Sequence, residues 1–277
     1  MYLDHFGLNE LPFGITPDTS FAFSTTAHQE ALNTLLIAVK SGEGFIKITG
    51  EVGTGKTLLC RRFLAALDGS FVTAYLPNPY LEPRTLLLAL AEELGTELPR
   101  DADQYHLLKS LNQALMDYAA QRKSVVVCLD EAQAMPLETM EVLRLLSNLE
   151  TEKRKLLQLV LFGQPELDAK LSNPSVRQLR QRISFSYKLG GLRRDELNLY
   201  LAHRLHVAGH RGERVFSAGA SRLIHKATVG TPRLVNILAH KALLSTYGEG
   251  RQQVKARHVR MAIGDTEGVH MPRWAFW

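Results

Sequence analysis

Cysteine and long apolar runs are scarce in this chain of 277 residues, and each scarcity excludes a class of protein. The two cysteines, Cys60 and Cys128, lie far apart within apolar stretches. They are too few for the disulfide framework of a small secreted domain or for a cysteine zinc cluster. No segment reaches the ~18 apolar residues of a membrane-spanning helix, and Met1-Tyr2-Leu3-Asp4-His5 lacks the basic and then apolar pattern of a secretion signal. We therefore expect a cytoplasmic protein with reduced thiols and no transmembrane segment.

Acidic residues are few in the last part of the chain. Residues 193–277 carry 14 Lys and Arg against 6 Asp and Glu, whereas residues 1–192 carry 19 against 22. A basic region of this kind is typical of a surface for nucleic acid or anionic lipid. It also fits a lid whose arginines face a nucleotide and a neighbouring subunit. The lid interpretation needs no additional partner, and we favour it.

One phosphate-binding pattern stands out. Gly50-Glu51-Val52-Gly53-Thr54-Gly55-Lys56-Thr57 matches the pattern G-x-x-x-x-G-K-[ST]. Glycines let such a loop bend closely around an anion and direct several N–H groups at it. Lys56 supplies a positive charge for the outer phosphates, and the Thr57 hydroxyl can bind Mg²⁺. Residues 44–49 predict a strand before the loop and residues 58–67 a helix after it, so the helix N-terminus would face the phosphates.

A pair of acidic residues follows a second strand pattern. Ser124-Val125-Val126-Val127-Cys128-Leu129 is followed directly by Asp130 and Glu131. A carboxylate at the tip of a buried parallel strand can reach Mg²⁺ beside the phosphate loop, and the next carboxylate can polarise the attacking water. A solvated acidic turn would give the same pattern, but the loop at residues 50–57 favours function. We therefore expect Asp130 and Thr57 to bind the metal and Glu131 to orient water.

Strand and helix patterns alternate up to about residue 190, which predicts an α/β fold with a parallel sheet between helices. The expected strands are residues 45–49, 71–76, 125–130, 156–162 and 183–189. Apolar residues at helical spacing lie between them, at residues 28–40, 85–94, 105–120 and 138–148. After Gly190-Gly191 the patterns are helical, at residues 193–208, 218–228, 232–247 and 255–263. The expected domains are an α/β domain over residues 1–191, a small all-helical lid over 192–268 and an aromatic tail over 269–277.

Seven motifs occur in order along the chain. They are Phe6-Gly7-Leu8 with Pro12-Phe13 and Pro17-Asp18, His28-Gln29-Glu30-Ala31-Leu32, the loop with Thr49 before it, Leu129-Asp130-Glu131-Ala132-Gln133, Gly163-Gln164-Pro165-Glu166-Leu167, Leu179-Arg180-Gln181-Arg182-Ile183, and Gly230-Thr231-Pro232-Arg233-Leu234-Val235-Asn236. Together they resemble the AAA+ ATPases, which have a P-loop NTPase domain and a helical lid. Within that group they resemble the ExeA/MshM family of general secretion pathway protein A and MSHA pilus biogenesis ATPases.

The resemblance implies ATP and Mg²⁺ as ligands and assigns further residues. Gln164 would be the polar sensor near the γ-phosphate, and Arg233 a second sensor that reaches the phosphates from the lid. Arg177 and Arg182 best match the position from which related ATPases present an arginine finger to the next subunit, and Arg180 is a third candidate there. The implied catalytic residues are Glu131, Lys56, Gln164, Arg233, Arg182 and Arg177. The implied nucleotide-binding residues are Gly50, Glu51, Val52, Gly53, Thr54, Gly55, Lys56, Thr57, Leu58 and Arg233.

Two aromatic segments remain open to alternatives. Residues 13–28 would form part of the adenine pocket by the resemblance, but Phe13, Phe21 and Phe23 could equally pack under the first long helix. The end of the chain, Met271-Pro272-Arg273-Trp274-Ala275-Phe276-Trp277, holds both tryptophans. It could anchor at a membrane surface or dock on a partner, or fold onto its own lid.

The family resemblance implies an ATP-hydrolysing enzyme that forms ATP-dependent oligomers. It would support assembly of a type IV (MSHA-like) pilus or a type II secretion apparatus through partners at the inner membrane, to which it would be peripheral. Longer family members continue beyond the lid, so a chain ending at Trp277 resembles the shorter, pilus-associated type. The main alternative is a DNA-binding regulatory AAA+ ATPase like the transposition helper proteins. The basic charge of the lid is the reason to retain this alternative. A nucleotide-gated scaffold with negligible turnover is a third possibility.

Overall fold

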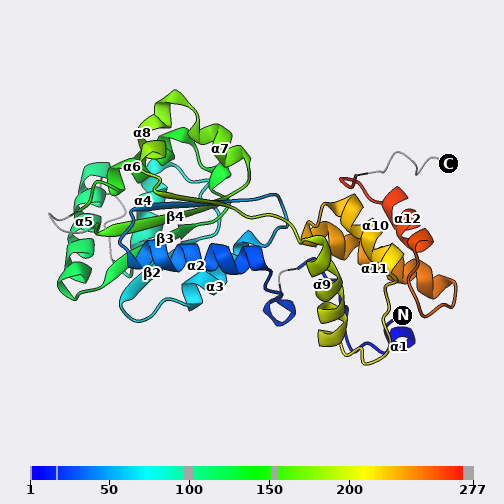
Figure 1. The fold of residues 1–277 in the computed structure, drawn as a ribbon. Helices are drawn as coiled ribbons and strands as arrows, with labels where there is room; N and C mark the ends of the chain where they lie inside the picture. Colours follow the sequence, from blue (N-terminus) through cyan, green and yellow to red (C-terminus); the bar gives the residue numbers. More distant parts are fainter. Residues whose placement is uncertain (1, 17, 97–102, 151–154, 271–277) are drawn as a thin grey trace. The chain divides into compact units, whose positions relative to one another are not determined.

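The computed structural model describes residues 2–16, 18–96, 103–150 and 155–270, which form two compact units (Figure 1). An α/β unit comprises Ala27–Glu51 and the described parts of Lys56–Leu189. A helical unit comprises the described parts of Met1–Thr26, Val52–Gly55 and Gly190–Trp277. The phosphate loop itself is therefore divided between the two.

The α/β unit is built on five parallel strands in the order β2-β3-β4-β1-β5. They are β1 (Phe45–Thr49), β2 (Phe71–Leu76), β3 (Ser124–Leu129), β4 (Leu157–Gly163) and β5 (Phe185–Lys188). Near-continuous apolar runs are typical of parallel strands buried on both faces, and every residue of β4 is buried. The predicted parallel α/β sheet is confirmed, and each predicted strand lies within two residues of the observed bounds.

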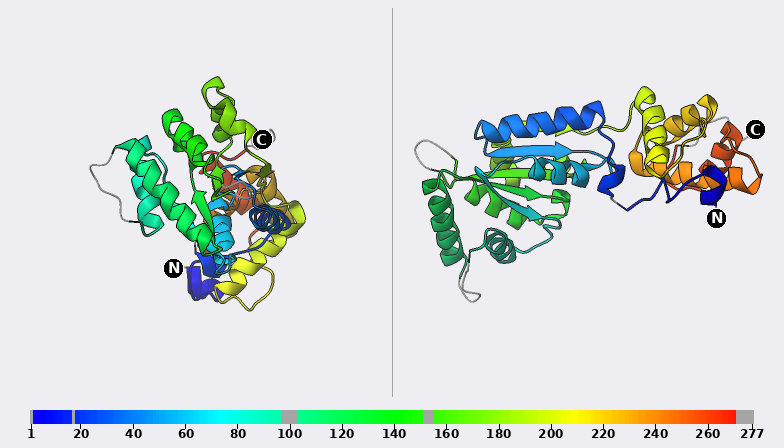
Figure 2. Two further views of the ribbon diagram at one scale, coloured as in Figure 1. Left: turned by 90° about the vertical axis from the view of Figure 1, so that its left-hand side faces the viewer. Right: turned by 90° about the horizontal axis from the view of Figure 1, so that it is seen from below.

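Helices cover both faces of this sheet (Figures 1 and 2). On one face, α2 (Thr26–Lys40) and α3 (Lys56–Ala65) share a core with Val126 and Cys128 of β3. On the other, Val125, Val127 and Leu129 pack with the remaining helices, as the alternation of side chains along a strand requires. Those helices are α4 (Pro83–Glu93), α5 (Gln104–Ala120), α6 (Leu137–Leu146), α7 (Glu166–Leu171) and α8 (Arg177–Gln181), with short 3₁₀ turns η2 (Ala132–Ala134) and η3 (Pro174–Val176).

The helical unit contains the four helices that the apolar spacing predicts. They are α9 (Arg194–Val207), α10 (Ala218–Thr228), α11 (Pro232–Gly248) and α12 (Ala256–Gly264). Two elements from the start of the chain join them, α1 (Tyr2–Phe6) and the 3₁₀ turn η1 (Thr19–Phe21). The unit is held by one apolar core, to which Tyr2, Phe6 and Phe13 contribute together with the helices of the C-terminal region.

Buried polar contacts also fix the start of the chain to the helical unit. Arg204 of α9 is only 7% exposed, and its Nε donates a 2.5 Å hydrogen bond to the carbonyl oxygen of Pro12. Asn236 of α11 donates from Nδ2 to the carbonyl oxygen of Gly14 at 3.0 Å. The Arg204 guanidinium also lies 4.7 Å from the centre of the Phe21 ring, a favourable cation–π arrangement. These contacts place residues 2–16 and 18–26 with the helical unit, whereas the sequence analysis assigns them to the α/β domain of residues 1–191.

The aromatic residues near the start of the chain pack within the helical unit. Phe13 meets Phe216 edge-on with ring centroids 5.7 Å apart, and Phe23 meets Tyr200 of α9 in the same way at 5.6 Å. These partners belong to the helical unit and not to α2, the first long helix. Phe13, Phe21 and Phe23 thus pack with the core of the helical unit, and their predicted places in the adenine pocket or under α2 stay predictions.

The turn between α10 and α11 is tightly packed against the chain that enters the helical unit. Gly230 has φ +76°, and a Cβ on it would lie 2.1 Å from the carbonyl oxygen of Leu192. We expect Gly230→Ala to destabilise the helical unit by at least about 2 kcal/mol, because an L-residue is strained at this φ and the backbone neighbour cannot move freely. Gly250→Ala is the matched control, with φ +65° and nothing within 4 Å of its Cβ. Urea unfolding measures both, and equal losses in the two variants would contradict the role of the close approach.

The last residues of the chain lie mostly outside the described residues. Of the predicted tail over residues 269–277, the structure describes Val269 and His270, and the His270 N–H donates to the carbonyl oxygen of Ala227 at 2.8 Å. Residues 271–277 and Pro17 are not among the described residues, so the tail's alternatives stay predictions. Within the described ranges, no helix combines the length and apolarity needed to cross a membrane.

Candidate nucleotide site

The phosphate loop joins the end of β1 to the start of α3, as predicted. Thr49 ends β1 and Lys56 begins α3, so the first turn of the helix opens directly on the loop. Gly53 and Gly55 have φ +79° and +93°, conformations that glycine adopts without a steric penalty. The Gly50 N–H donates to the carbonyl oxygen of Gly163 at 3.1 Å, which ties the loop to the end of β4. Loops of this geometry direct consecutive backbone N–H groups toward an anion.

Lys56 is only 5% exposed and its ammonium lies over its own loop. The Nζ donates to the carbonyl oxygens of Gly50 at 2.8 Å and Glu51 at 3.0 Å. Burial lowers the pKa of Lys56, although the nearby carboxylates of Glu131 and Asp130 oppose that shift. A partly desolvated ammonium whose acceptors among the described residues are backbone carbonyls is well suited to exchange them for phosphate oxygens, which bind it more strongly.

Asp130 and Thr57 meet as the sequence predicts. The Thr57 hydroxyl donates to Oδ2 of Asp130 at 2.6 Å, and the Tyr75 hydroxyl of β2 donates to the same oxygen at 3.3 Å. Asp130 is 2% exposed, and burial raises the pKa of its carboxyl while the hydrogen bond from Thr57 opposes the rise. A carboxylate and a hydroxyl side by side are the hard oxygen donors that Mg²⁺ prefers, so these residues fit that metal.

Glu131 takes an unusual backbone conformation directly after Asp130. Its φ of 54° and ψ of 36° lie in the left-handed region, where residues other than glycine are strained and cluster at functional sites. Its Oε2 accepts hydrogen bonds from Nε2 of Gln133 at 2.5 Å and Nε2 of Gln164 at 3.0 Å. Burial works to raise the pKa of Glu131, but these two bonds and the Lys56 charge outweigh it and lower the pKa. The carboxylate is therefore held ionised beside the loop.

Gln164, implied by the resemblance as a sensor of the γ-phosphate, lies against Glu131 in this structure, and its sensor role stays a prediction. The contacts of Gln133 and Tyr75 with the acidic pair were not predicted from the sequence. Gln133 lies two residues after Glu131, in the motif quoted for the family resemblance, and that spacing was the available signal. Tyr75 is recognisable only from the sheet, because β2 pairs with β3 and places Tyr75 opposite Cys128. Leu58 follows Thr57 on α3, as expected for a residue at the start of that helix.

The candidate arginine fingers differ in their surroundings. Arg182 follows α8, and its Nη1 donates to Oγ of Ser147 at 3.0 Å and to the Ser147 carbonyl oxygen at 3.3 Å. Arg177 and Arg180 are exposed on α8, and neither forms a hydrogen bond or ion pair with another described residue. Arg233 is the second residue of α11 in the helical unit and is exposed. Arg177 is thus freer than Arg182 to meet a second molecule.

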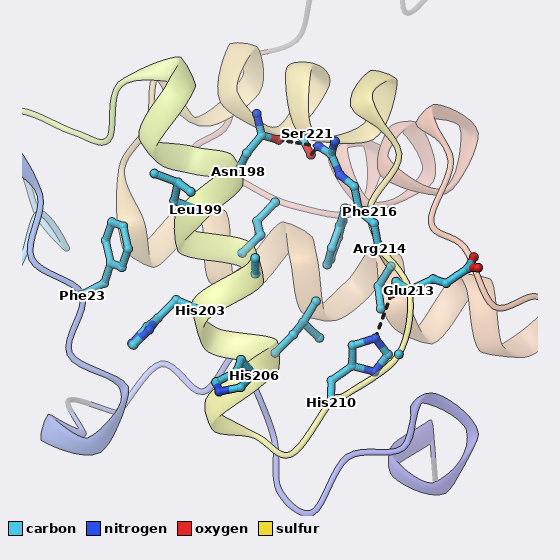
Figure 3. Close-up of a pocket in the computed structure, with 15 residues that line it drawn as sticks. Phe23, Asn198, Leu199, His203, His206, His210, Glu213, Arg214, Phe216 and Ser221 are labelled. Carbon is cyan, nitrogen blue, oxygen red and sulfur yellow. Dashed lines mark hydrogen bonds between the residues drawn. The ribbon is translucent and has the colours of Figure 1, made fainter.

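The helical unit contains a separate cavity of about 730 Å³ beside α9 (Figure 3). Its lining is largely apolar, with Leu199 and Phe216 among the contributors, and Phe23 lies at one side of it. His203, His206 and His210 also line it. Among the described residues, however, no group of three or more His, Cys, Asp or Glu is arranged to hold a metal ion. The cavity therefore offers no metal site to add to the Thr57 and Asp130 pair.

Comparison with known proteins supports the interpretation of this site. A family model described as an AAA domain matches residues 39–171, which include the phosphate loop and both acidic residues. General secretion pathway protein A of Aeromonas hydrophila is 38% identical over 269 residues. The match covers 97% of this chain and 49% of that protein, so the chain spans about half the length of this relative.

Solved structures show the same fold at low sequence identity. The ORC2 protein of Aeropyrum pernix, in ADPNP and ADP complexes, has a TM-score of 0.62 at 19% identity, over 93% of this chain and 73% of that one. The RuvB Holliday junction branch migration motor of Thermotoga maritima has a TM-score of 0.58 at 16% identity, over 92% and 73% of the two chains. The predicted P-loop fold is confirmed. The chain has the AAA+ fold, and its predicted resemblance to general secretion pathway protein A is borne out by sequence over nearly the whole of this chain.

Proposed function

We propose that this protein binds ATP with Mg²⁺ and hydrolyses it. The observation that carries the proposal is the meeting of Thr57 with Asp130 at 2.6 Å, next to a buried Lys56 and a Glu131 held by two amides. Two chain segments distant in sequence supply an ammonium, a hydroxyl and two carboxylates to one edge of the sheet, and a third supplies the Gln164 amide. Such convergence at the carboxyl ends of parallel strands is where α/β proteins bind nucleotides.

In the proposed reaction each residue has one task. Residues 50–58 bind the phosphates through backbone N–H groups, and Lys56 neutralises charge on the outer phosphates. Thr57 and Asp130 hold Mg²⁺, which supplies Lewis-acid charge stabilisation when bound. Glu131 orients the attacking water and accepts its proton. Gln164 donates to the γ-phosphate, and Arg233 contacts the nucleotide from the helical unit.

The direct test is release of phosphate from ATP by the purified protein, with and without Mg²⁺. We expect turnover that is lost when EDTA removes the metal and returns when Mg²⁺ is added in excess. ATP binding by the same preparation is followed separately by calorimetry. Binding without any turnover would favour the nucleotide-gated scaffold, and absence of both would refute the nucleotide site.

We further propose that the protein forms ATP-dependent oligomers in which Arg177 completes the site of the next subunit. The support is that Arg177 is exposed and unpaired among the described residues, whereas Arg182 is bonded to Ser147. Mixing Lys56→Ala with Arg177→Ala in equal amounts should restore about a quarter of wild-type turnover, because one in four head-to-tail interfaces then carries both intact groups.

The control mixture combines Arg177→Ala with the double variant Lys56→Ala/Arg177→Ala, which contains no intact Arg177 and should stay inactive. Sedimentation with and without ATP reports the oligomer. A fully active protein that stays monomeric at every concentration contradicts the shared site. Recovery with Arg182→Ala but not with Arg177→Ala would move the finger to Arg182.

For the cellular role, we propose a cytoplasmic ATPase, peripheral to the inner membrane, that supports a type II secretion apparatus or a type IV (MSHA-like) pilus. The support is the relationship to general secretion pathway protein A. The test is whether ATP-bound Glu131→Gln protein sediments with inner-membrane vesicles and captures secretion or pilus components there. The basic region of residues 193–277 favours a second candidate, a DNA-binding regulatory ATPase. Retention on DNA that weakens steeply with salt would support that candidate, because phosphate contacts release counterions.

A further inference from the structure

The Gln133 side chain forms hydrogen bonds with both Glu131, which follows β3, and Gln164, which follows β4. Its Oε1 accepts a 3.0 Å hydrogen bond from the backbone N–H of Gln164, and its Nε2 donates to Oε2 of Glu131 at 2.5 Å. A backbone N–H can only donate, so the oxygen end of the Gln133 amide must face Gln164. The nitrogen end is then left for the Glu131 carboxylate, which can only accept. Each half of this one amide therefore has its matching partner.

The backbone that carries Gln133 is anchored. Nζ of Lys170, on α7, donates 2.6 Å hydrogen bonds to the carbonyl oxygens of both Gln133 and Met135. Met135 is fully buried in the core under α6 and α7. The Ala134 N–H also donates to the Glu131 carbonyl oxygen at 2.8 Å. Gln133 is thus held at a fixed distance from Glu131 by contacts that do not involve the phosphate loop.

Gln164 holds Glu131 in a different way. Its backbone is fixed at the end of β4 by the bond to Gln133, but its side-chain amide donates only to Oε2 of Glu131 among the described residues. That amide can turn toward a phosphate without breaking any backbone contact. Glu131 then loses one of the two donors on Oε2 and keeps the other. The two glutamines are therefore unequal partners of the same carboxylate oxygen.

We infer that Gln133 is the positioning residue for Glu131 in ATP hydrolysis. It is the stationary donor that keeps the Glu131 carboxylate oriented when the Gln164 side chain leaves for the γ-phosphate. The inference rests on the proposed function, since it concerns the same reaction. Glu131 makes this contact from a backbone of φ 54°, a strained conformation of the kind that clusters at functional sites.

Two substitutions of Gln133 by residues of similar size distinguish a role in orienting Glu131 from a role that only supports the backbone at Gln164. Gln133→Met removes both hydrogen bonds. Gln133→Glu keeps an acceptor for the Gln164 N–H but loses the donor to Glu131. Gln113→Met is the control, since Gln113 is exposed on α5 and donates to Asp117 far from the site. Turnover as a function of ATP concentration is measured for each variant, together with hydrogen exchange of the Gln164 backbone amide.

We expect kcat to fall about tenfold or more in both Gln133 variants while KM stays within about twofold, because Gln133 donates to the water-orienting carboxylate and forms no hydrogen bond with the phosphate loop of residues 50–58 among the described residues. Exchange at Gln164 should quicken in Gln133→Met and stay slow in Gln133→Glu. Near wild-type kcat in Gln133→Glu would overturn the inference. The hydrogen bond from the Gln164 N–H to residue 133 would then be enough for hydrolysis without the donor to Glu131. A raised KM with unchanged kcat, or unchanged exchange at Gln164 in Gln133→Met, would overturn it as well. Absence of turnover in the wild type would instead refute the proposed function from which the inference starts.

Discussion

Glu131→Gln is expected to lower ATP turnover by about a hundredfold or more while ATP affinity changes by less than about threefold. The substituted amide has the same shape, and its oxygen can still accept from Gln133 and Gln164, which hold Oε2 of Glu131 at 2.5 and 3.0 Å. The fold and the phosphate contacts should therefore persist. What is lost is the negative charge that polarises water and receives its proton. Steady-state phosphate release and calorimetric ATP binding measure the two effects separately.

Glu138→Gln is the matched control for that experiment. It removes the same charge from an exposed position in the first turn of α6, only a few residues away. Turnover of this control should equal that of the wild type. If Glu131→Gln hydrolysed ATP at the wild-type rate, the water would have to be oriented by another residue. Equal losses in both variants would point to a general effect of charge near the site.

Lys56→Ala is expected to weaken ATP binding by about tenfold to a hundredfold and to abolish measurable turnover. A hydrogen bond to a charged group contributes roughly 1.5–3 kcal/mol, and each 1.4 kcal/mol corresponds to about a factor of ten in affinity. The Lys56 ammonium is buried and directed at the loop by the Gly50 and Glu51 carbonyls. Calorimetric titration with ATP and Mg²⁺ gives the affinity.

The control is Lys40→Ala, which removes the same charge from the exposed end of α2. It should bind ATP as the wild type does. Thermal unfolding of both variants checks that the α/β unit remains folded, since lost binding in an unfolded protein would be uninformative. A folded Lys56→Ala protein with undiminished ATP affinity contradicts the assignment of residues 50–57 as the phosphate site.

The parts of the site that the sequence predicted are those in which the relevant residues are close in the chain. Gly50 to Thr57 form one continuous loop, and Asp130 and Glu131 directly follow a run of apolar residues. In a parallel sheet, strand ends that follow such runs gather at one edge, so the meeting of Thr57 with Asp130 could be foreseen. The helices were predictable for a similar reason, since apolar residues at a spacing of three and four mark the buried face.

Other features depended on contacts between distant residues. No local pattern connects Arg204 with Pro12, which are 192 residues apart, and so the start of the chain could not be placed with the helical unit before the fold was known. The role of Gln133 was missed because an amide after an acidic pair is also common in ordinary turns. Only the position of the Gln164 N–H and the Glu131 carboxylate on either side of it shows that both ends of the amide are used.

The amino-acid sequence by itself determined the α/β fold and the residues of the phosphate loop, because short-range patterns of glycine, charge and apolar spacing specify local backbone geometry. The tertiary structure alone decided which unit holds the start of the chain, that Arg182 is bonded to Ser147 whereas Arg177 and Arg180 are unpaired among the described residues, and which two amides hold Glu131. Those outcomes follow from burial and hydrogen-bond matching between segments far apart in sequence. A buried donor or acceptor must find a partner wherever the fold supplies one, and the order of residues along the chain does not reveal where that is.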